Sequence, residues 1–439
     1  MIDGNLKDRK RKAISGAEKV RAFQRKIYLK AKQEKKFSFY IMYDKIFHHH
    51  FLFEAWKRVK ANKGAPGYDK VTFSEIEKYG VVKYLQELAE ELESEMYKPQ
   101  PVLRAYILKA NGKKRPLGIP TIRDRIVQMS CKLVIEPIFE ADFEDCSYGF
   151  RPKRSAKGAI SAIKTNLKRG KSKVYDADLS GFFDNIPHDK LMVLLGRRIS
   201  DKRVLRLIMK WLKCTIFEDN KLCKSKKGTP QGGVISPLLA NIYLNLLDKA
   251  VARKDGNFYK YGISIIRYAD DFILMGNSLA ESSLQYLNIM LNRMELAINI
   301  DKTKQIDARQ ESFDFLGFTF RYDKGIYGNN GKYWNVIPSK KSEVKLRENL
   351  KKVFRHCRHY SNELIVRILN PKIRGWLNYF SIKGISYPSK AKSNLQWYLN
   401  RSLYHFYQRK SQRKCNLYRR GAFDYLVHNY GLINPTNYT

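Results

Sequence analysis

Hydrophobic and polar positions follow two periods along the chain, and these predict a mixture of helices and short strands. Apolar residues spaced three or four apart predict helices with one buried face, at 51–62, 81–96, 124–140, 234–254 and 280–298, with two more within 188–213. Short apolar runs bounded by turn residues predict strands, at 102–108, 115–119, 173–179, 263–268, 272–275 and 313–320. From Pro338 onward the pattern is helical and basic.

Turns between the predicted strands carry the polar residues of interest. Asn111-Gly112 is a strong two-residue hairpin signal between the first two strands. Two later strands meet at Asp270-Asp271, so a hairpin there would hold both carboxylates at its bend. Another predicted strand ends at Asp178.

Composition limits the class of protein. Of 439 residues, 44% are hydrophobic and 13% are aromatic, which is enough for a packed core and excludes wholesale disorder. No run approaches the roughly 20 apolar residues of a membrane span, and the lysine-rich start lacks the apolar stretch of a secretory signal. The 6 cysteines form no C-x-x-C pair, so we expect reduced thiols in a cytoplasmic, most simply bacterial, protein.

The charge balance points to the partner. Lys and Arg number 84 against 42 Asp and Glu, a formal charge of +42. A polyanion such as nucleic acid relieves this self-repulsion. The excess is concentrated in residues 1–36, with 13 basic and 4 acidic, and in 339–439, with 21 and 4. We expect RNA or DNA as partner and 1–36 as an exposed arm that orders on binding, with an anionic membrane surface as the alternative partner of that arm.

Carboxylates at the ends of two neighbouring strands would form a site of hard oxygen ligands. Such a set suits Mg²⁺, with Mn²⁺ as a substitute, because these ions take a few carboxylates and fill their other positions with water and phosphate oxygens. Two ions about 4 Å apart stabilise the attacking and leaving oxygens of a phosphoryl displacement. Without cations, Asp178, Asp270 and Asp271 would raise one another's pKa. Spacing alone leaves ordinary surface turn residues as the alternative.

The residues around these aspartates carry a family resemblance. Residues 178–184 (Asp-Leu-Ser-Gly-Phe-Phe-Asp) resemble the first metal-binding motif of reverse transcriptases, and residues 268–271 (Tyr-Ala-Asp-Asp) match the second. Residues 229–237 (Thr-Pro-Gln-Gly-Gly-Val-Ile-Ser-Pro) resemble the motif that packs under the incoming nucleotide. Order and spacing fit for all three, so the chain resembles an RNA-directed DNA polymerase.

Further matches narrow the resemblance to the group II intron branch and extend it over roughly residues 51–400. They lie at 63–69, 115–120, 148–152, 299–303 and 315–318, and residues 374–380 (Arg-Gly-Trp-Leu-Asn-Tyr-Phe) resemble the maturase, or X, region. The resemblance implies an α+β right-hand polymerase, with fingers and palm around an antiparallel sheet and a helical thumb. The implied domains are a basic N-terminal extension (1–50), fingers and palm (51–325), thumb and maturase X domain (326–400) and a short basic tail (401–439) that would be a DNA-binding remnant, with no endonuclease domain.

The resemblance also implies roles for single residues. The catalytic metal ligands would be Asp178, Asp270 and Asp271, completed by the Leu179 carbonyl. Phe183 would sit under the sugar and exclude a 2′-hydroxyl, and its alternative is an ordinary core phenylalanine. Gln231 would contact the incoming nucleotide, and its alternative is a turn role.

Basic residues would handle the phosphates. Lys109 and Arg115 would clamp the triphosphate. Lys302 would neutralise or protonate the pyrophosphate leaving group, or else be a surface lysine. Arg151 would be a template or structural contact. The basic helices after 339 would track the template–primer duplex and bind intron RNA, through Lys340, Lys341, Lys372 and Arg374, while Trp376, Tyr379 and Phe380 are expected in the core.

The implied partners are an RNA template, a DNA primer, deoxynucleotides and a cognate group II intron RNA, without a membrane. The sequence does not set the oligomeric state. Two other functions stay open: an RNA-binding splicing cofactor in which polymerisation is secondary, and a reverse transcriptase recruited to phage defence or CRISPR adaptation.

Overall fold

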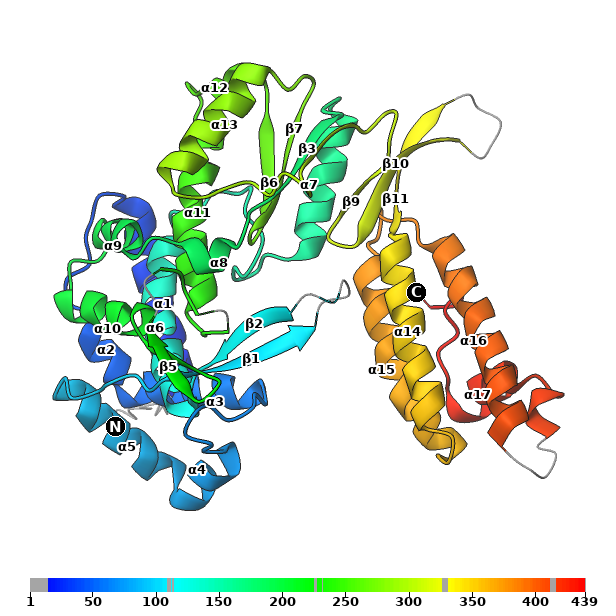
Figure 1. Ribbon diagram of the computed structural model, residues 1–439, viewed down its shortest axis with the longest axis horizontal. Helices are drawn as coiled ribbons and strands as arrows, with labels where there is room; N and C mark the ends of the chain where they lie inside the picture. Colours follow the sequence, from blue (N-terminus) through cyan, green and yellow to red (C-terminus); the bar gives the residue numbers. More distant parts are fainter. Residues whose placement is uncertain are drawn as a thin grey trace, which may run out of the picture.

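The computed structural model describes residues 15–438, except 109–111, 113, 225–226, 231, 326–330 and 411–415. An α+β part ends with strand β11 (Lys332–Pro338), and a helical part begins with α14 (Lys340–His356). The two parts lie side by side and are joined at the sheet that contains β11 (Figure 1). The expectation of an α+β chain with a helical end is confirmed.

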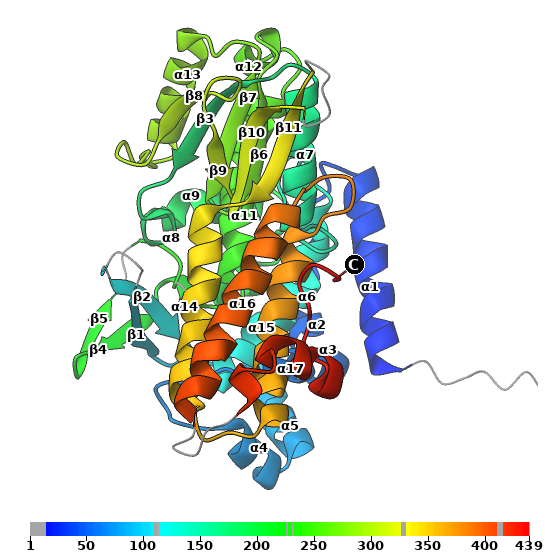
Figure 2. The same ribbon diagram turned by 90° about the vertical axis from the view of Figure 1, so that its right-hand side faces the viewer.

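Six helices form the N-terminal layer of the α+β part. Their bounds are α1 (Gly16–Gln33), α2 (Tyr43–Phe47), α3 (His49–Ala61), α4 (Phe73–Tyr79), α5 (Val81–Glu93) and α6 (Ile122–Glu140). Helix α6 is buried along most of its length, and α1, α2 and α3 pack against it (Figure 2). In the view of Figure 1, this layer of helices lies in the lower part of the α+β part.

The expectation of an exposed arm over 1–36 is wrong for α1. The helix begins with a capping box, in which the Ser15 hydroxyl accepts from the Glu18 N–H and the Glu18 carboxylate accepts from the Ser15 N–H. Val20 and Ala31 on its inner face are fully buried. The buried face is narrow and flanked by lysines and arginines, so the apolar period is hard to see in the sequence.

The central sheet has four antiparallel strands in the order β6-β7-β3-β8. Their bounds are β3 (Lys173–Asp178), β6 (Ser264–Tyr268), β7 (Asp271–Gly276) and β8 (Lys304–Asp307). On β7, Phe272 and Leu274 belong to the core built with α11 (Ser236–Ala252) and α13 (Glu281–Arg293), whereas Ile273 and Met275 face α7 (Ala156–Lys168). Because both faces are covered, residues 272–275 of this strand are all apolar.

A second sheet, in the order β2-β1-β4-β5, contains the predicted hairpin. Strands β1 (Val102–Leu108) and β2 (Lys114–Ile119) pair antiparallel, which confirms it. Strand β4 (Thr215–Glu218) pairs with β1 in parallel and with β5 (Lys221–Lys224) antiparallel. The sequence pattern does not predict β4 and β5, because four residues are too few to show a period.

Two predicted helices precede β4 and are confirmed as α9 (His188–Gly196) and α10 (Lys202–Leu212). The carboxylate of Asp201 caps α10 by accepting from the Arg203 and Val204 N–H groups. Short helices α8 (Phe182–Asn185) and α12 (Asn257–Lys260) complete this part.

The third sheet has the strand order β11-β10-β9. The prediction of one strand at 313–320 is wrong, because this segment forms parts of two strands. The segment is divided into β9 (Phe313–Phe315) and β10 (Phe318–Lys324) by a tight turn at Leu316 and Gly317, whose φ angles are +49° and +81°. Strand β11, from Lys332 to Pro338, is not among the strands that the sequence pattern predicts.

Helices α14, α15 (Asn362–Phe380), α16 (Ser389–Lys410) and α17 (Ala422–Tyr430), with the 3₁₀ turn η1 (Asn416–Tyr418), share one core. The predicted boundary at 400 therefore falls inside α16, where Leu399 and Leu403 are both fully buried. The boundary at 325 likewise separates the paired strands β10 and β11. The change from sheet to helices lies at Ser339, the N-cap of α14.

The aromatic residues of α15 join the helical part to the third sheet. Phe380 is 5% exposed and its ring centroid lies 4.8 Å from that of Phe318. The Tyr379 hydroxyl donates to the Leu316 carbonyl at 2.9 Å. The predicted core position is confirmed for Phe380, whereas Trp376 and Tyr379 are partly buried against the same core. No helix among the described residues is long and apolar enough to cross a lipid bilayer.

Candidate active site

Three aspartates meet at one end of the central sheet. Asp178, the last residue of β3, lies opposite Asp271, the first residue of β7, in the antiparallel register. Directly opposed side chains have Cβ atoms about 5 Å apart. Asp270 and Ala269 form the two-residue turn between β6 and β7. The three carboxylates that the sequence singled out are therefore neighbours.

These carboxylates disturb one another. Burial raises the pKa of Asp271 to about 6, and the charges of Asp270, Asp178 and Asp176 add to the shift. Asp271 keeps a solvent-exposed surface, so it is crowded by protein on one side and open on the other. Burial also raises the pKa of Asp270, and Asp178 adds to it. Asp176 lies two residues before Asp178 on β3 and joins the cluster, since burial and the charge of Asp178 raise its pKa to about 6.

A lysine approaches this cluster from the segment that follows α13. The Asn299 N–H donates to the Asp178 carbonyl at 2.8 Å, which places the segment over the end of β3. Lys302 Nζ then donates to Asp178 Oδ2 at 2.5 Å, although its side chain is 60% exposed. The structure thus brings Lys302 to the aspartates, and its ammonium group already balances one carboxylate.

Phe183 lies on α8, directly after β3. Its ring is 9% exposed and meets Phe182 edge to face, with centroids 5.4 Å apart. Its carbonyl accepts from the Thr229 N–H at 2.7 Å, which ties α8 to the glycine-rich loop before α11. Leu179 is buried and forms an isolated bridge with Ile298.

The glycine-rich loop fits between α8 and β2 because two of its residues, Gly228 and Gly232, have no Cβ. Gly228 has φ +85°, and a Cβ there would lie 2.7 Å from the Asp184 backbone. Gly232 has φ +116°, and a Cβ there would overlap the Gly118 carbonyl oxygen. The loop therefore connects the aspartate end of the central sheet with the β1–β2 hairpin. Gln231 lies outside the described residues.

The β1–β2 hairpin brings positive charge towards the aspartates. Arg115 lies on β2 opposite Ile107, and its charge lowers the pKa of Asp270. This electrostatic effect places the guanidinium on the aspartate side of the hairpin. Lys109, the other predicted triphosphate ligand, lies outside the described residues.

The donor set fits hard divalent cations. In the described part of the chain, no group of three or more His, Cys, Asp or Glu side chains is arranged as a metal site without further ligands. An open set is what Mg²⁺ uses when substrate phosphates supply its remaining ligands. Burial, and then the neighbouring carboxylates, raise the pKa of Asp271, and a bound cation would oppose both effects.

Comparisons with known proteins identify the family. A family model for reverse transcriptase (RNA-dependent DNA polymerase) matches residues 107–320, and one for the group II intron maturase-specific domain matches residues 344–423. Protein YkfC of Escherichia coli (strain K12) is 37% identical over 329 residues, which cover 66% of this chain and 85% of that protein. The group II intron-encoded protein LtrA of Lactococcus lactis is 45% identical over 168 residues, or 38% of this chain. This chain belongs to the group II intron family of reverse transcriptases and maturases.

The match covers only part of some relatives, since the aligned segment spans 28% of LtrA. Among solved structures, a chain of the partial Cas6-RT-Cas1–Cas2 complex aligns with a TM-score of 0.36 and 23% identity, covering 56% of this chain and 42% of that chain. Within this group II family member, the reverse transcriptase match ends inside β10, and the maturase-specific match begins in α14 and ends in α17.

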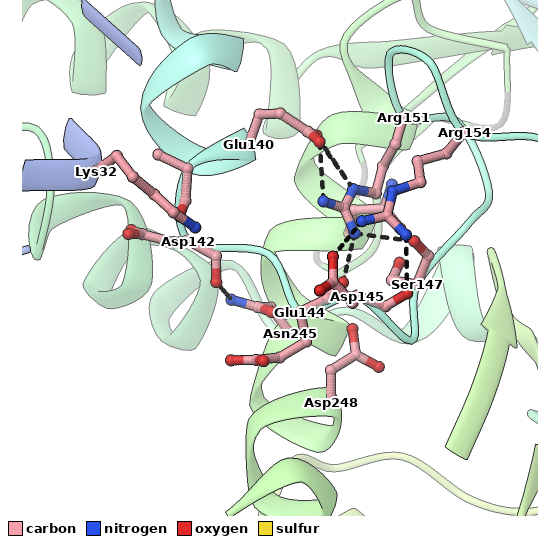
Figure 3. Close-up of polar contacts among 12 residues, drawn as sticks. Lys32, Glu140, Asp142, Glu144, Asp145, Ser147, Arg151, Arg154, Asn245 and Asp248 are labelled. Atoms are coloured by element: carbon pink, nitrogen blue, oxygen red, sulfur yellow. Dashed lines mark hydrogen bonds and ion pairs between the residues drawn. The ribbon is translucent and has the colours of Figure 1, made fainter. Parts of the chain in front are cut away.

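Arg151 of this reverse transcriptase makes structural contacts, which is one of the two roles that the sequence left open for it, the other being a template contact. Its side chain is 3% exposed and pairs with the Glu140 carboxylate at 2.8 Å. It also donates to the carbonyls of Glu144 and Ser147 (Figure 3). Its donors thus face protein acceptors, and it holds the segment after α6 in place.

The other predicted nucleic-acid contacts lie on the helical part. All four are exposed to solvent, with two at the start of α14 and two on α15: Lys340, Lys341, Lys372 and Arg374. They lie within or just before the maturase-specific match.

Sequence reasoning missed Arg267 and Asp248, which lie behind the aspartate turn. Both side chains are fully buried, and they form an ion pair. The signal was present, because a single cation stands in the apolar run 263–268 and a single acid in the leucine-rich helix α11. Opposite charges isolated in two apolar segments indicate a buried pair.

Proposed function

We propose that this group II reverse transcriptase joins a deoxynucleotide to a primer 3′-hydroxyl at the aspartate cluster. The observation that supports this most is the register that sets Asp178 against Asp271, with Asp270 in the adjoining turn. The primer 3′-hydroxyl loses its proton to water and its oxygen forms a bond to the α-phosphorus, while the bond from that phosphorus to the bridging oxygen breaks and pyrophosphate leaves. Two bound Mg²⁺ ions, or Mn²⁺ in their place, would stabilise the attacking and leaving oxygens.

The chain's own residues hold and orient the reactants. Asp178, Asp270 and Asp271 are the metal ligands, and the Leu179 carbonyl is the fourth protein oxygen. Lys302 lies 2.5 Å from Asp178, within reach of the departing pyrophosphate, to which it can give a proton. A lysine that bonds to a ligand carboxylate is already oriented towards the site of charge development.

The β1–β2 hairpin and the glycine-rich loop form the nucleotide pocket. Arg115 and Lys109 bind the triphosphate, and Gln231 contacts the nucleotide. Phe183 presents a largely buried aromatic ring at the end of β3 and leaves no polar partner for a ribose 2′-hydroxyl. This steric exclusion selects deoxynucleotides.

In right-hand terms, the N-terminal layer and the hairpin sheet are the fingers, the central sheet is the palm, and the helical part from α14 is the thumb and maturase domain. The N-terminal extension then continues through α1 into the fingers. The template is RNA and the primer is DNA, held between the aspartate end of the palm and the helical part.

The maturase role falls to the helical part, through binding of group II intron RNA. A hollow of about 470 Å³ lies between α14 and α16, and its lining includes Lys351, Arg355, Arg358, Arg401 and Arg409. Aromatic residues Phe354 and Tyr398 form part of its wall. Cations beside aromatic surfaces suit RNA phosphates and unpaired bases. Exposed lysines on α14 and α15 extend this surface.

A primer-extension experiment tests the polymerase proposal. The full chain is incubated with an RNA template, an annealed DNA primer, four deoxynucleotides and Mg²⁺. We expect extension to the template end, and none with the Asp270→Ala and Asp271→Ala double variant. Extension by the double variant at the parental rate would refute the assignment.

The splicing-cofactor function is the second candidate, favoured by the maturase-specific match over residues 344–423. The same double variant separates the two functions. If the chain acts mainly by stabilising intron RNA, splicing of RNA that copurifies with it should continue without polymerisation. Sequencing that RNA also distinguishes an intron partner from the templates of a defence or adaptation system.

A further inference from the structure

The aspartate turn is held from behind by a buried arginine. Arg267 is 0% exposed, and all of its guanidinium nitrogens donate to protein acceptors. Nε and Nη2 bind the two Asp248 carboxylate oxygens at 2.8 and 2.5 Å. Nη2 also donates to the Ser147 hydroxyl at 2.8 Å. Nη1 donates to the side-chain oxygen of Asn241 at 2.9 Å and to the carbonyl of Ala269 at 2.8 Å.

The last of these contacts reaches the catalytic turn itself. Ala269 directly precedes Asp270 and has φ +59°, a conformation that glycine adopts more readily than alanine. A non-glycine residue in this region is held there by its surroundings. Arg267 supplies the hydrogen bond to its carbonyl.

A second contact fixes the same residue from the opposite side. Gly149 approaches so closely that a Cβ on it would overlap the Ala269 backbone nitrogen. The Gly149 carbonyl accepts from Asn241 Nδ2 at 2.8 Å, and Asn241 accepts from Arg267. The contacts close into a ring that contains Arg267, Asn241, Gly149 and Ala269.

Such an assembly is a poor means of stabilising the fold. Burying Arg267 and Asp248 removes both charges from water, and apolar residues of similar volume often stabilise a core equally well. The pair instead fixes the orientation of the groups around it, because a guanidinium holds several acceptors in one plane. The turn it holds carries mutually repelling carboxylates.

We propose that Arg267, with Asp248 as its counter-ion, is a positioning residue that holds the Ala269–Asp270 turn in the geometry required for binding divalent cations. It acts through the Ala269 carbonyl and touches neither substrate nor metal. This inference rests on the proposed polymerase function for its consequence in catalysis, but its effect on metal affinity can be measured separately.

The decisive variant removes both charges together. Arg267→Met with Asp248→Leu leaves no unpaired buried ion, so the chain should fold, while the hydrogen bond to Ala269 is lost. Electron paramagnetic resonance of Mn²⁺ added to the full chain with template–primer measures metal affinity. We expect its dissociation constant to rise about tenfold or more, and the maximal extension rate to fall about 10²-fold, with little change in the KM for the primer.

A matched variant controls for loss of any buried ion pair. Arg198 Nε lies 3.0 Å from Asp142 Oδ2, with side chains 7% and 16% exposed, and this pair lies at the end of α1 away from the turn. Arg198→Met with Asp142→Leu should lower the melting temperature and leave Mn²⁺ affinity unchanged. If both double variants change Mn²⁺ affinity equally, Arg267 has no specific role and the inference is wrong.

A conservative variant keeps the test decisive if the first double variant does not fold. Arg267→Lys retains the charge beside Asp248, but a lysine cannot reach all five acceptor atoms. The Mn²⁺ affinity of this variant should therefore lie between that of the parent and that of a chain without the hydrogen bond to the Ala269 carbonyl. Parental Mn²⁺ affinity in a folded variant overturns the inference. If the parent itself extends no primer, the proposed function fails, and the Mn²⁺ comparison still decides the role of Arg267.

Discussion

Lys302 Nζ lies 2.5 Å from Asp178 Oδ2, so a cationic side chain from a different segment of the chain contacts the cluster. The contact orders a residue that is 60% exposed. Because Asp178 is also opposite Asp271, the lysine stands at the edge of the proposed metal site. It can leave Asp178 when a divalent cation binds there and then face the leaving group.

Neutralising Lys302 should slow the chemical step more than it weakens metal binding. With Lys302→Gln we expect the single-turnover rate to fall about 10²-fold, the size of a lost proton donor. Mn²⁺ affinity should stay the same or increase, because one competitor for Asp178 is gone. Lys324→Gln, an exposed lysine on β10, is the control. An unchanged rate would remove Lys302 from the mechanism.

Asp271 should make the metal-free protein less stable as pH rises. Its pKa is about 6 when folded against an ordinary 3.8, so the folded state holds the proton more tightly than the unfolded chain. The stability from this group is present below about pH 4 and is lost as pH rises through 6. In EDTA at pH 7.5, Asp271→Asn should therefore melt roughly 2 °C above the parent, and the gap should shrink towards pH 5. Scanning calorimetry at both pH values measures it, and a gap independent of pH would contradict this account.

Phe183 should control the choice of sugar. Phe183→Val opens space under the ribose, and we expect the preference for a deoxynucleotide over its ribonucleotide to fall about 10²-fold in kcat/KM. Phe182→Leu is the matched control, because Phe182 is 2% exposed and packs against Phe183. That variant should lower the melting temperature and keep the preference. Equal selectivity in the Val variant and the parent would return Phe183 to an ordinary core role.

The hollow between α14 and α16 should bind structured RNA through its phosphates. Arg355→Gln combined with Arg401→Gln should weaken binding of intron RNA and reduce the slope of log affinity against log salt by about 1 to 2. Extension of a short primer should be unchanged. Lys78→Gln with Lys83→Gln, on the exposed surface of α4 and α5, is the charge-matched control. An identical salt slope in all three proteins would exclude this hollow as an RNA contact.

The proximity of the three aspartates could be predicted from the sequence because strand ends and hairpin turns have local signals. The turn at Asp270 and the end of the strand at Asp178 are both visible as apolar runs that stop at an acid. Family motifs then placed them in one site. The sequence pattern did not predict strands β4 and β5, because β4 is stabilised by pairing with the distant β1 and β5 by pairing with β4.

Other features depend on contacts that no local pattern contains. Helix α1 is dominated by lysine and arginine, and its packing depends on a few small or apolar residues such as Val20. The sequence left Arg151 open between a template and a structural contact, and only the fold shows its ion pair with Glu140 on α6. Arg267 and Asp248 are 19 residues apart, and only the fold shows that the first also reaches the catalytic turn.

Single-nucleotide incorporation by Asp178→Asn is the most direct measure of the central claim. The full chain is bound to an RNA template with a DNA primer, and the first incorporation is followed with Mg²⁺. Asp307→Asn is the control, since Asp307 lies on the same sheet and pairs with Lys173 at the opposite end of β3 at 2.9 Å. We predict that both variants bind the duplex and that incorporation falls at least about 10³-fold only in Asp178→Asn. Parental incorporation by a folded Asp178→Asn variant would contradict the account.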